Sequence, residues 1–263
     1  MTANLTRALF IGDDRVASAR SITATSWVGS DYAPANVANR VPAYRWATTD
    51  PLAELTIDFG ADVAISAILV ELYRGEWPLP TGGTFRFRLD PDGGAAGAGA
   101  LLDRTVAADL VEGYATHLEL LDAEYAARYL TIKLGLTGAD RYEVATAIAG
   151  TWWQPPDNYS FGAVEKRVDP SDLSMRAASG TLHPDYRPGW RSWSLQLDQM
   201  PEDTRDWFRD LHRQQGQRGR FVFCKEPAAA ATETAVCRFA SDPAFTRNLP
   251  LAWDIPVEIE QLV

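Results

Sequence analysis

Three histidines are the first side chains to consider for catalysis or metal binding: His117, His183 and His212. None lies at a metal-ligand spacing from another histidine or from a cysteine, so the sequence predicts no zinc site. His183 and Asp185 could form an acid–base pair. The segment 182–186 is more typical, however, of a proline-containing turn with a capping aspartate.

Acidic residues are abundant, with 35 Asp and Glu in 263 residues. A glycosidase needs two carboxylates across a cleft, but here any pair could be nominated, so abundance does not indicate an enzyme. No nucleophile elbow, phosphate-binding glycine loop or dinucleotide fingerprint is present. A calcium site in the loops around Asp31, Asp50, or Asp90 and Asp92 is compatible with the sequence. We expect a protein that is not an enzyme and has no cofactor.

The formal net charge of −10 argues against nucleic acid and anionic membranes as partners, because both need clustered Lys and Arg. No apolar run approaches the ~20 residues of a membrane span, so no membrane insertion is expected. Cys224 and Cys237 are the only cysteines. They flank a turn-like segment, 225–235. This spacing is compatible with a pair of free thiols and also with a disulfide across a hairpin.

The first ~150 residues carry short β-rich runs and almost no helical period, which predicts an antiparallel β-sandwich. In one run Leu55, Ile57 and Phe59 alternate with polar residues, and Gly60 is expected to end that strand. The glycine-rich segment 91–100 is predicted to be a flexible loop, with a binding lip as the alternative. The expected strands are 52–59, 65–73, 84–89, 117–121 and 129–136.

The amino-acid composition changes at 151–159, where Pro155 and Pro156 follow two tryptophans. This change predicts a boundary between domains 1–155 and 156–263. Trp152 and Trp153 are expected to pack at this junction, with a sugar-stacking platform as the alternative. Beyond it, a helix is predicted over 201–215, stopped by Gly216. The expected strands of this half are 192–197, 220–224, 235–239 and 250–260.

An ordered series of motifs in residues 18–150 resembles the discoidin-like (galactose-binding-like) family. The motifs are Ser26-Trp27, 34–37 with its Ala-Asn pair, Arg45-Trp46, 55–60 ending in Asp-Phe-Gly, and the runs 65–70, 127–132 and 145–150.

The resemblance implies a jelly-roll β-sandwich whose end loops bind glycans, lipids or proteins. It implies core packing for Trp46. Aromatic rings can stack on a sugar, and arginines can hydrogen-bond its hydroxyls. The candidate ligand residues in these loops are Trp27, Tyr32, Tyr44, Arg45, Arg74 and Trp77.

Residues 158–263 are similar to the tail-hub domain of phage distal tail proteins. The similarity lies in 190–203, in the adjacent aromatics Trp207 and Phe208, in 219–223 and in the long final strand 253–260. It implies a β-rich split barrel with one α-helix that closes a ring through head-to-tail contacts. The family usually begins with its hub domain, whereas here a sandwich precedes it.

Together the two resemblances imply a structural protein of a long-tailed bacteriophage tail tip or baseplate, assembled in the cytoplasm of the bacterial host. Its expected partners are further copies of itself in a ring, tail tube and tail hub proteins, and host surface glycans. The alternatives are a free carbohydrate-binding module, or a carbohydrate-active enzyme with the sandwich as an accessory domain. A third is a sandwich that binds only neighbouring tail proteins.

Overall fold

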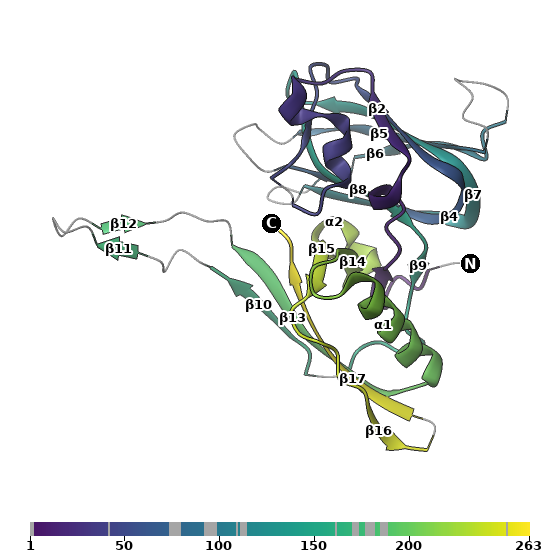
Figure 1. Ribbon diagram of the computed structural model, residues 1–263, viewed down its shortest axis with the longest axis vertical. Coiled ribbons are helices and arrows are strands. Elements are labelled where there is room, and N and C mark those ends of the chain that lie inside the picture. Colours follow the sequence, from purple (N-terminus) through teal and green to yellow (C-terminus); the bar gives the residue numbers. More distant parts are fainter. Residues whose placement is uncertain are drawn as a thin grey trace. The chain divides into compact units, whose positions relative to one another are not determined.

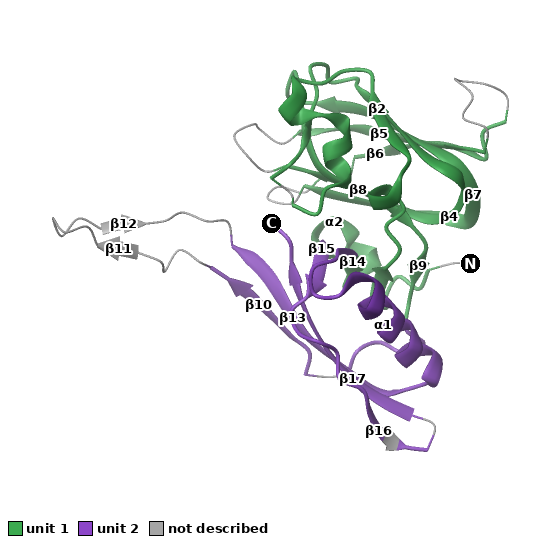
Figure 2. Cartoon of the chain, viewed as in Figure 1, with its two compact units in different colours: residues 1–154, 222–234 green, residues 155–221, 235–263 purple. Residues whose placement is uncertain are grey.

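The computed structural model describes residues 3–41, 43–73, 80–91, 99–108, 110, 115–160, 162–169, 174–176, 182–184, 189–250 and 252–263. The chain forms two compact units, which Figure 2 distinguishes by colour. The first comprises residues 1–154 and 222–234, and the second comprises 155–221 and 235–263. The domain division at 155/156 stays a prediction, and it does not foresee the assignment of 222–234 to the first unit.

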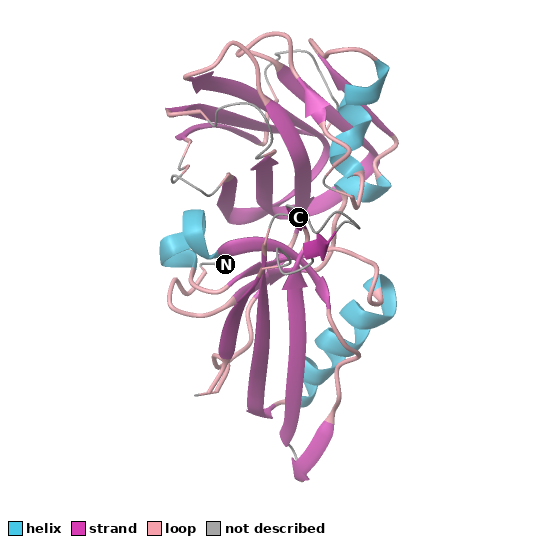
Figure 3. Cartoon of the chain, turned by 90° about the vertical axis from the view of Figure 1, so that its left-hand side faces the viewer, coloured by secondary structure: helices cyan, strands magenta, loops and turns pink. Residues whose placement is uncertain are grey.

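Strands dominate both units (Figure 3). Those of the first unit are β1 (Leu9–Ile11), β2 (Ser21–Ala24), β3 (Trp46–Ala47), β4 (Glu54–Leu72), β5 (Gly82–Asp90), β6 (Leu102–Ala107), β7 (Thr116–Thr137), β8 (Glu143–Gly150), β9 (Trp152–Trp153) and β14 (Phe221–Cys224), whose first residue belongs to the second unit. Its helices are η1 (Val16–Ser18), η2 (Ser30–Tyr32), η3 (Pro34–Ala38), η5 (Pro227–Ala229) and α2 (Ala230–Glu233).

Two long strands, β4 and β7, build the sandwich of the first unit by running through both of its layers (Figure 1). In one layer, residues 54–58 of β4 pair with β2 and β7, and residues 129–137 of β7 pair with β5, which pairs with β6. In the other layer, residues 67–72 of β4 lie between β7 and β8, and β8 pairs with β3. All these pairings are antiparallel, which confirms the predicted sandwich.

The core lies between the two layers. One layer contributes Leu55 and Phe87, and the other contributes Ile68 and Val70. Each fully buried side chain of this size stabilises the fold by roughly 1.5–3 kcal/mol relative to its exposed state. Trp46 is 0% exposed, so its predicted role in the core is confirmed.

Gly60 does not end a strand, contrary to the prediction. The separate strands expected at 52–59 and 65–73 are the two parts of β4. The pairing of β4 with β7 shifts register between Asp58 and Val63, and Gly60 has φ +83 there. A conformation that only glycine adopts easily lets the strand bend and continue into the second layer, so the glycine marks a bend rather than a stop.

The second unit is an antiparallel sheet with strand order β10-β13-β17-β15, and β16 pairs with β17. Its strands are β10 (Val164–Val168), β13 (Trp190–Met200), β15 (Thr234–Phe239), whose first residue belongs to the first unit, β16 (Thr246–Leu249) and β17 (Ala252–Gln261). Strands β11 (Ser174–Arg176) and β12 (Leu182–Pro184) form a separate pair.

Helix α1 (Glu202–Gln215) covers one face of this sheet and confirms the helix predicted at 201–215. It buries Phe208 and Leu211, and β17 turns Ile255 and Val257 inward by strict alternation. Gly216, at φ 54, ends the helix, and its backbone N–H donates to the carbonyl oxygen of His212. The residues of β13 and β17 that point away from α1 form the open face of the sheet.

The structure also tests the predictions for the segment 225–235, the two cysteines and the glycine-rich loop. The segment 225–235 is not a simple turn, because it contains η5 and α2. Cys224 and Cys237 are buried and form no disulfide. Most of the glycine-rich segment 91–100 lies outside the described residues. Within the described part of the chain, no helix is long and apolar enough to cross a membrane.

Candidate functional site

The strand registers bring several loops together at one end of the sandwich. β2 ends at Ala24 opposite Leu55, near the start of β4, while β5 starts at Gly82 opposite the end of β7. In the other layer, the end of β4 lies beside the start of β8, because Tyr73 donates its backbone N–H to the Glu143 carbonyl oxygen at 2.7 Å. The segments 25–53, 73–81 and 138–142 therefore meet at this end, which we call the loop end.

Arg45 is the centre of the loop end. Its guanidinium carbon lies 4.1 Å from the ring centroid of Tyr73 and 5.1 Å from that of Tyr32, so both rings make cation–π contacts with it. Its Nε donates to Glu143 Oε2 at 2.7 Å and its Nη1 donates to the Ala43 carbonyl oxygen at 3.2 Å. The guanidinium is therefore held at a fixed place. We call Tyr32, Arg45, Tyr73 and Glu143 the Arg45 cluster.

The pair of charges in this cluster is unequally buried. The Glu143 side chain is 4% exposed and that of Arg45 is 21% exposed. Burying a carboxylate this far from water is costly unless it is paired and hydrogen-bonded, and Arg45 is the partner that does both. The arginine keeps access to solvent, so it can also meet a ligand.

Asn36 fixes the backbone around the cluster. Its side-chain amide donates to the carbonyl oxygens of Asp31 and Arg45, at 2.7 and 3.0 Å. One side chain thus ties η2, which carries Tyr32, to the segment that carries Arg45. Trp46 adds a second tie, because its Nε1 donates to the Ser26 carbonyl oxygen at 2.9 Å.

The structure places four of the six predicted ligand residues. Tyr32 and Arg45 meet in the cluster. Trp27 and Tyr44 lie on neighbouring segments of the loop end and are 48% and 54% exposed, which is unusual for large aromatic side chains. The remaining two residues, Arg74 and Trp77, lie outside the described part of the chain.

The sequence-based selection missed Asn36, Tyr73 and Glu143. Glu143 carried a usable signal, because it is the one charged residue in the otherwise apolar or small run 143–150, and a buried charge needs a partner. Tyr73 carried a weaker one, since it directly precedes the predicted loop residue Arg74. Asn36 lies within the Ala-Asn motif, but nothing in the sequence indicates which carbonyl groups it bonds.

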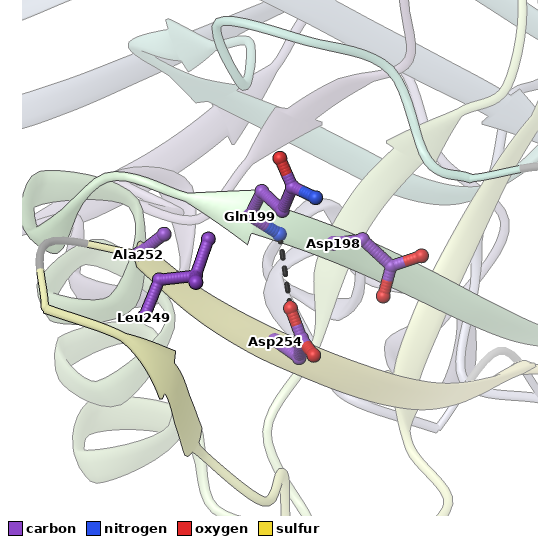
Figure 4. A pocket seen from close by; sticks show the side chains of 5 residues that line it. All are labelled: Asp198, Gln199, Leu249, Ala252 and Asp254. Carbon is purple, nitrogen blue, oxygen red and sulfur yellow. Dashed lines mark hydrogen bonds between the residues drawn. The ribbon is translucent and has the colours of Figure 1, made fainter.

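A second feature is a pocket of about 440 Å³ on the open face of the second unit (Figure 4). It is lined by Asp198, Gln199, Leu249, Ala252 and Asp254. The Gln199 backbone N–H donates to Asp254 Oδ1 at 3.0 Å. Hydrogen bonds from Ser160 and Gln196 lower the pKa of Asp198, so this carboxylate is charged at neutral pH.

Among the described residues, the His and the other Asp side chains form no cluster of metal ligands. His117 is buried against Phe85 and Phe87, and His212 Nε2 lies 3.1 Å from Asp242 Oδ1. The side chains of His183 and Asp185 lie outside the described residues. Among the residues that are described, no three His, Cys, Asp or Glu side chains gather as metal ligands.

Trp152 and Trp153 form β9, which pairs with β1. The Trp153 ring lies 6.2 Å from that of Phe10, centroid to centroid, and Phe10 also contacts Phe223. Both tryptophans are half-buried. They take part in packing within the first unit, at a distance along the chain from the segments of the loop end.

No protein-family model matches the chain. No curated protein matches it either. Among solved structures, it is similar to the family 32 carbohydrate-binding module of NanJ from C. perfringens, solved with galactose, with 13% identity and a TM-score of 0.42 over 56% of this chain and 99% of that one.

A Streptococcus pneumoniae fucose-binding module is 15% identical with a TM-score of 0.41, over 51% of this chain and 93% of that one. A Ruminococcus gnavus GH29 fucosidase, solved with fucose, is 18% identical with a TM-score of 0.41, over 52% of this chain. The match spans only 26% of the fucosidase.

Proposed function

We propose that the protein is a non-catalytic glycan-binding protein and that the sugar site is the loop end of the sandwich. The observation that carries the proposal is the Arg45 cluster, in which a partly exposed guanidinium is immobilised by two tyrosine rings and a buried carboxylate. Fixing a donor group before the ligand arrives reduces the entropy lost on binding.

The cluster has hydrogen-bonding capacity to spare. A guanidinium carries five N–H donors, and Arg45 uses one on Glu143 and one on Ala43. The other donors have no partner among the described residues and suit the hydroxyl oxygens of a sugar. Tyr44 and Trp27 supply exposed aromatic surface on which the apolar face of a sugar ring can stack.

The electrostatics favour binding over hydrolysis. A glycosidase acid needs a raised pKa so that it holds a proton at neutral pH. In the second unit, where the enzymatic alternative would place catalysis, the hydrogen bonds to Asp198 lower its pKa.

A glycan array tests the proposal, with the wild type compared with Tyr44→Ala and Leu101→Ala. Both side chains are exposed, at 54% and 41%, but Leu101 directly precedes β6 and lies beside the end of β5, at the opposite end of the sandwich. We expect the wild type and Leu101→Ala to bind the same glycans, and Tyr44→Ala to lose about tenfold in affinity through lost stacking. An array without binding, or equal binding by all three proteins, would overturn the proposal.

A second role, assembly into a tail-tip ring of a phage particle, is supported by β10. This strand pairs with β13 along one edge, and its first four residues, beginning with Val164, are exposed. The other edge has no strand partner among the described residues, and an open edge can pair with a neighbouring copy. Light scattering tests this: a closed oligomer supports the ring, and a monomer at all concentrations argues against it.

A further inference from the structure

The pocket on the open face of the second unit plays no part in the glycan binding proposed for the loop end. It exists because β13 bulges. Leu197 pairs with Ile255 and Met200 pairs with Trp253, so two residues of β13, Asp198 and Gln199, lie opposite Asp254 alone. In a regular strand these two neighbours would point to opposite faces, whereas both line the pocket.

The bulge places two carboxylates together. Figure 4 shows Asp254 between Asp198 at one end of the pocket and Leu249 with Ala252 at the other. Gln199 adopts φ 55, the only positive φ of a described residue other than glycine, and its N–H holds Asp254. Each carboxylate is thus oriented by donors of the chain itself.

Among the described residues, none forms an ion pair with the carboxylate of Asp198. The hydrogen bonds that orient it come from the neutral side chains of Gln196 and Ser160. Carboxylates on neighbouring strands favour a cation placed near both of them.

The opposite end of the pocket is apolar. Leu249 is 51% exposed, and Ala252 lies beside it on the paired strand. An apolar wall in the same pocket as two carboxylates suits a group with a hydrocarbon stem and a cationic head. The volume of about 440 Å³ lies within the range of small-ligand sites.

We propose that this pocket takes a lysine or arginine side chain of a partner protein, with the cationic head between Asp198 and Asp254 and the stem on Leu249 and Ala252. The exposed positions of Asp198 and Leu249 make the pocket reachable by a side chain that another folded surface presents. The inference does not depend on glycan binding, since the described residues that line the pocket belong to the second unit.

The test is a titration of isotope-labelled full-length protein, followed through the amide signals of Gln199 and Asp254. The probes are the Nα-acetyl N-methylamides of lysine, arginine and norleucine, together with methylammonium and free lysine. We expect saturable shifts with the capped lysine and arginine, and at least fivefold weaker binding of norleucine, which lacks the charge, and of methylammonium, which lacks the stem.

Asp198→Asn removes one charge from an exposed position, and Glu258→Gln removes one from the same open face outside the pocket. Asp198→Asn should weaken binding of the capped lysine about tenfold and Glu258→Gln less than twofold. The proposal would be overturned if norleucine bound as tightly as lysine, if the two variants had equal effects, or if no shifts appeared. It would also be overturned if free lysine bound more tightly than capped lysine, because that would indicate an amino-acid site.

Discussion

Removing Arg45 should destabilise the sandwich more than removing the charge of Glu143, although the two groups form one pair. Arg45→Met leaves the Glu143 carboxylate, 4% exposed, without its cation. Breaking a buried ion pair from one side costs ~3–5 kcal/mol, and the partial exposure of Arg45 places the expected cost near ~3 kcal/mol. Glu143→Gln leaves the guanidinium with an amide oxygen and access to water, so we expect about 1.5 kcal/mol.

The double variant removes both charges and leaves neither orphaned, so its cost should be about 2 kcal/mol, well below the sum of the two single changes. Hydrogen exchange of peptides from β8 and β3 is the suitable assay, because it reports on this unit alone. A loss of about 3 kcal/mol corresponds to exchange about 100-fold faster.

Equal costs for the two single variants, or costs that add to within about 0.5 kcal/mol in the double variant, would refute this account of the cluster. The first outcome would mean that Glu143 reaches water as easily as Arg45 does. The second would mean that the 2.7 Å contact between them contributes nothing to stability.

Three further outcomes follow from other contacts. The hydrogen bonds and charge of Arg128 lower the pKa of Asp58, so the stabilisation from this pair should be present at neutral pH and be lost as the pH falls through the lowered pKa. The difference in unfolding free energy between wild type and Asp58→Asn should therefore shrink in acid, and a difference independent of pH would contradict this. Ser160→Ala removes a donor to Asp198 and should raise its pKa, which a carboxyl-carbon NMR titration measures; an unchanged pKa would refute the assigned role. Gly216→Ala should cost about 1–3 kcal/mol because Gly216 has φ 54 and ψ −157, and unchanged unfolding of the second unit would contradict it.

The elements of the fold were predictable where one periodicity held over a whole element. The alternation of Ile255, Val257 and Ile259 predicted β17, and the apolar stripe with a terminal glycine predicted α1. The bend at Gly60 was not predictable in the same way. A glycine after an alternating run is equally compatible with a strand end and with a bulge, and only the pairing with β7 decides between them.

The site was predictable by residue type but not by arrangement. The aromatic and arginine side chains in the predicted loops indicated Tyr32, Tyr44 and Arg45. The partners that hold Arg45 are far away in sequence, since Glu143 lies 98 residues further along the chain. Such pairings depend on the sheet order, which a single sequence does not contain. The pocket at Asp198 depends on the bulge in β13, which a single sequence does not reveal either.

The most direct test of glycan binding at the loop end is to map a bound glycan onto the isotope-labelled protein by amide shift changes, with a glycan selected on the array. The account predicts that the largest changes fall on residues 26–48, on Tyr73 and on Glu143. Changes concentrated at 59–63 and 99–101, at the opposite end of the sandwich, or in the second unit would contradict it.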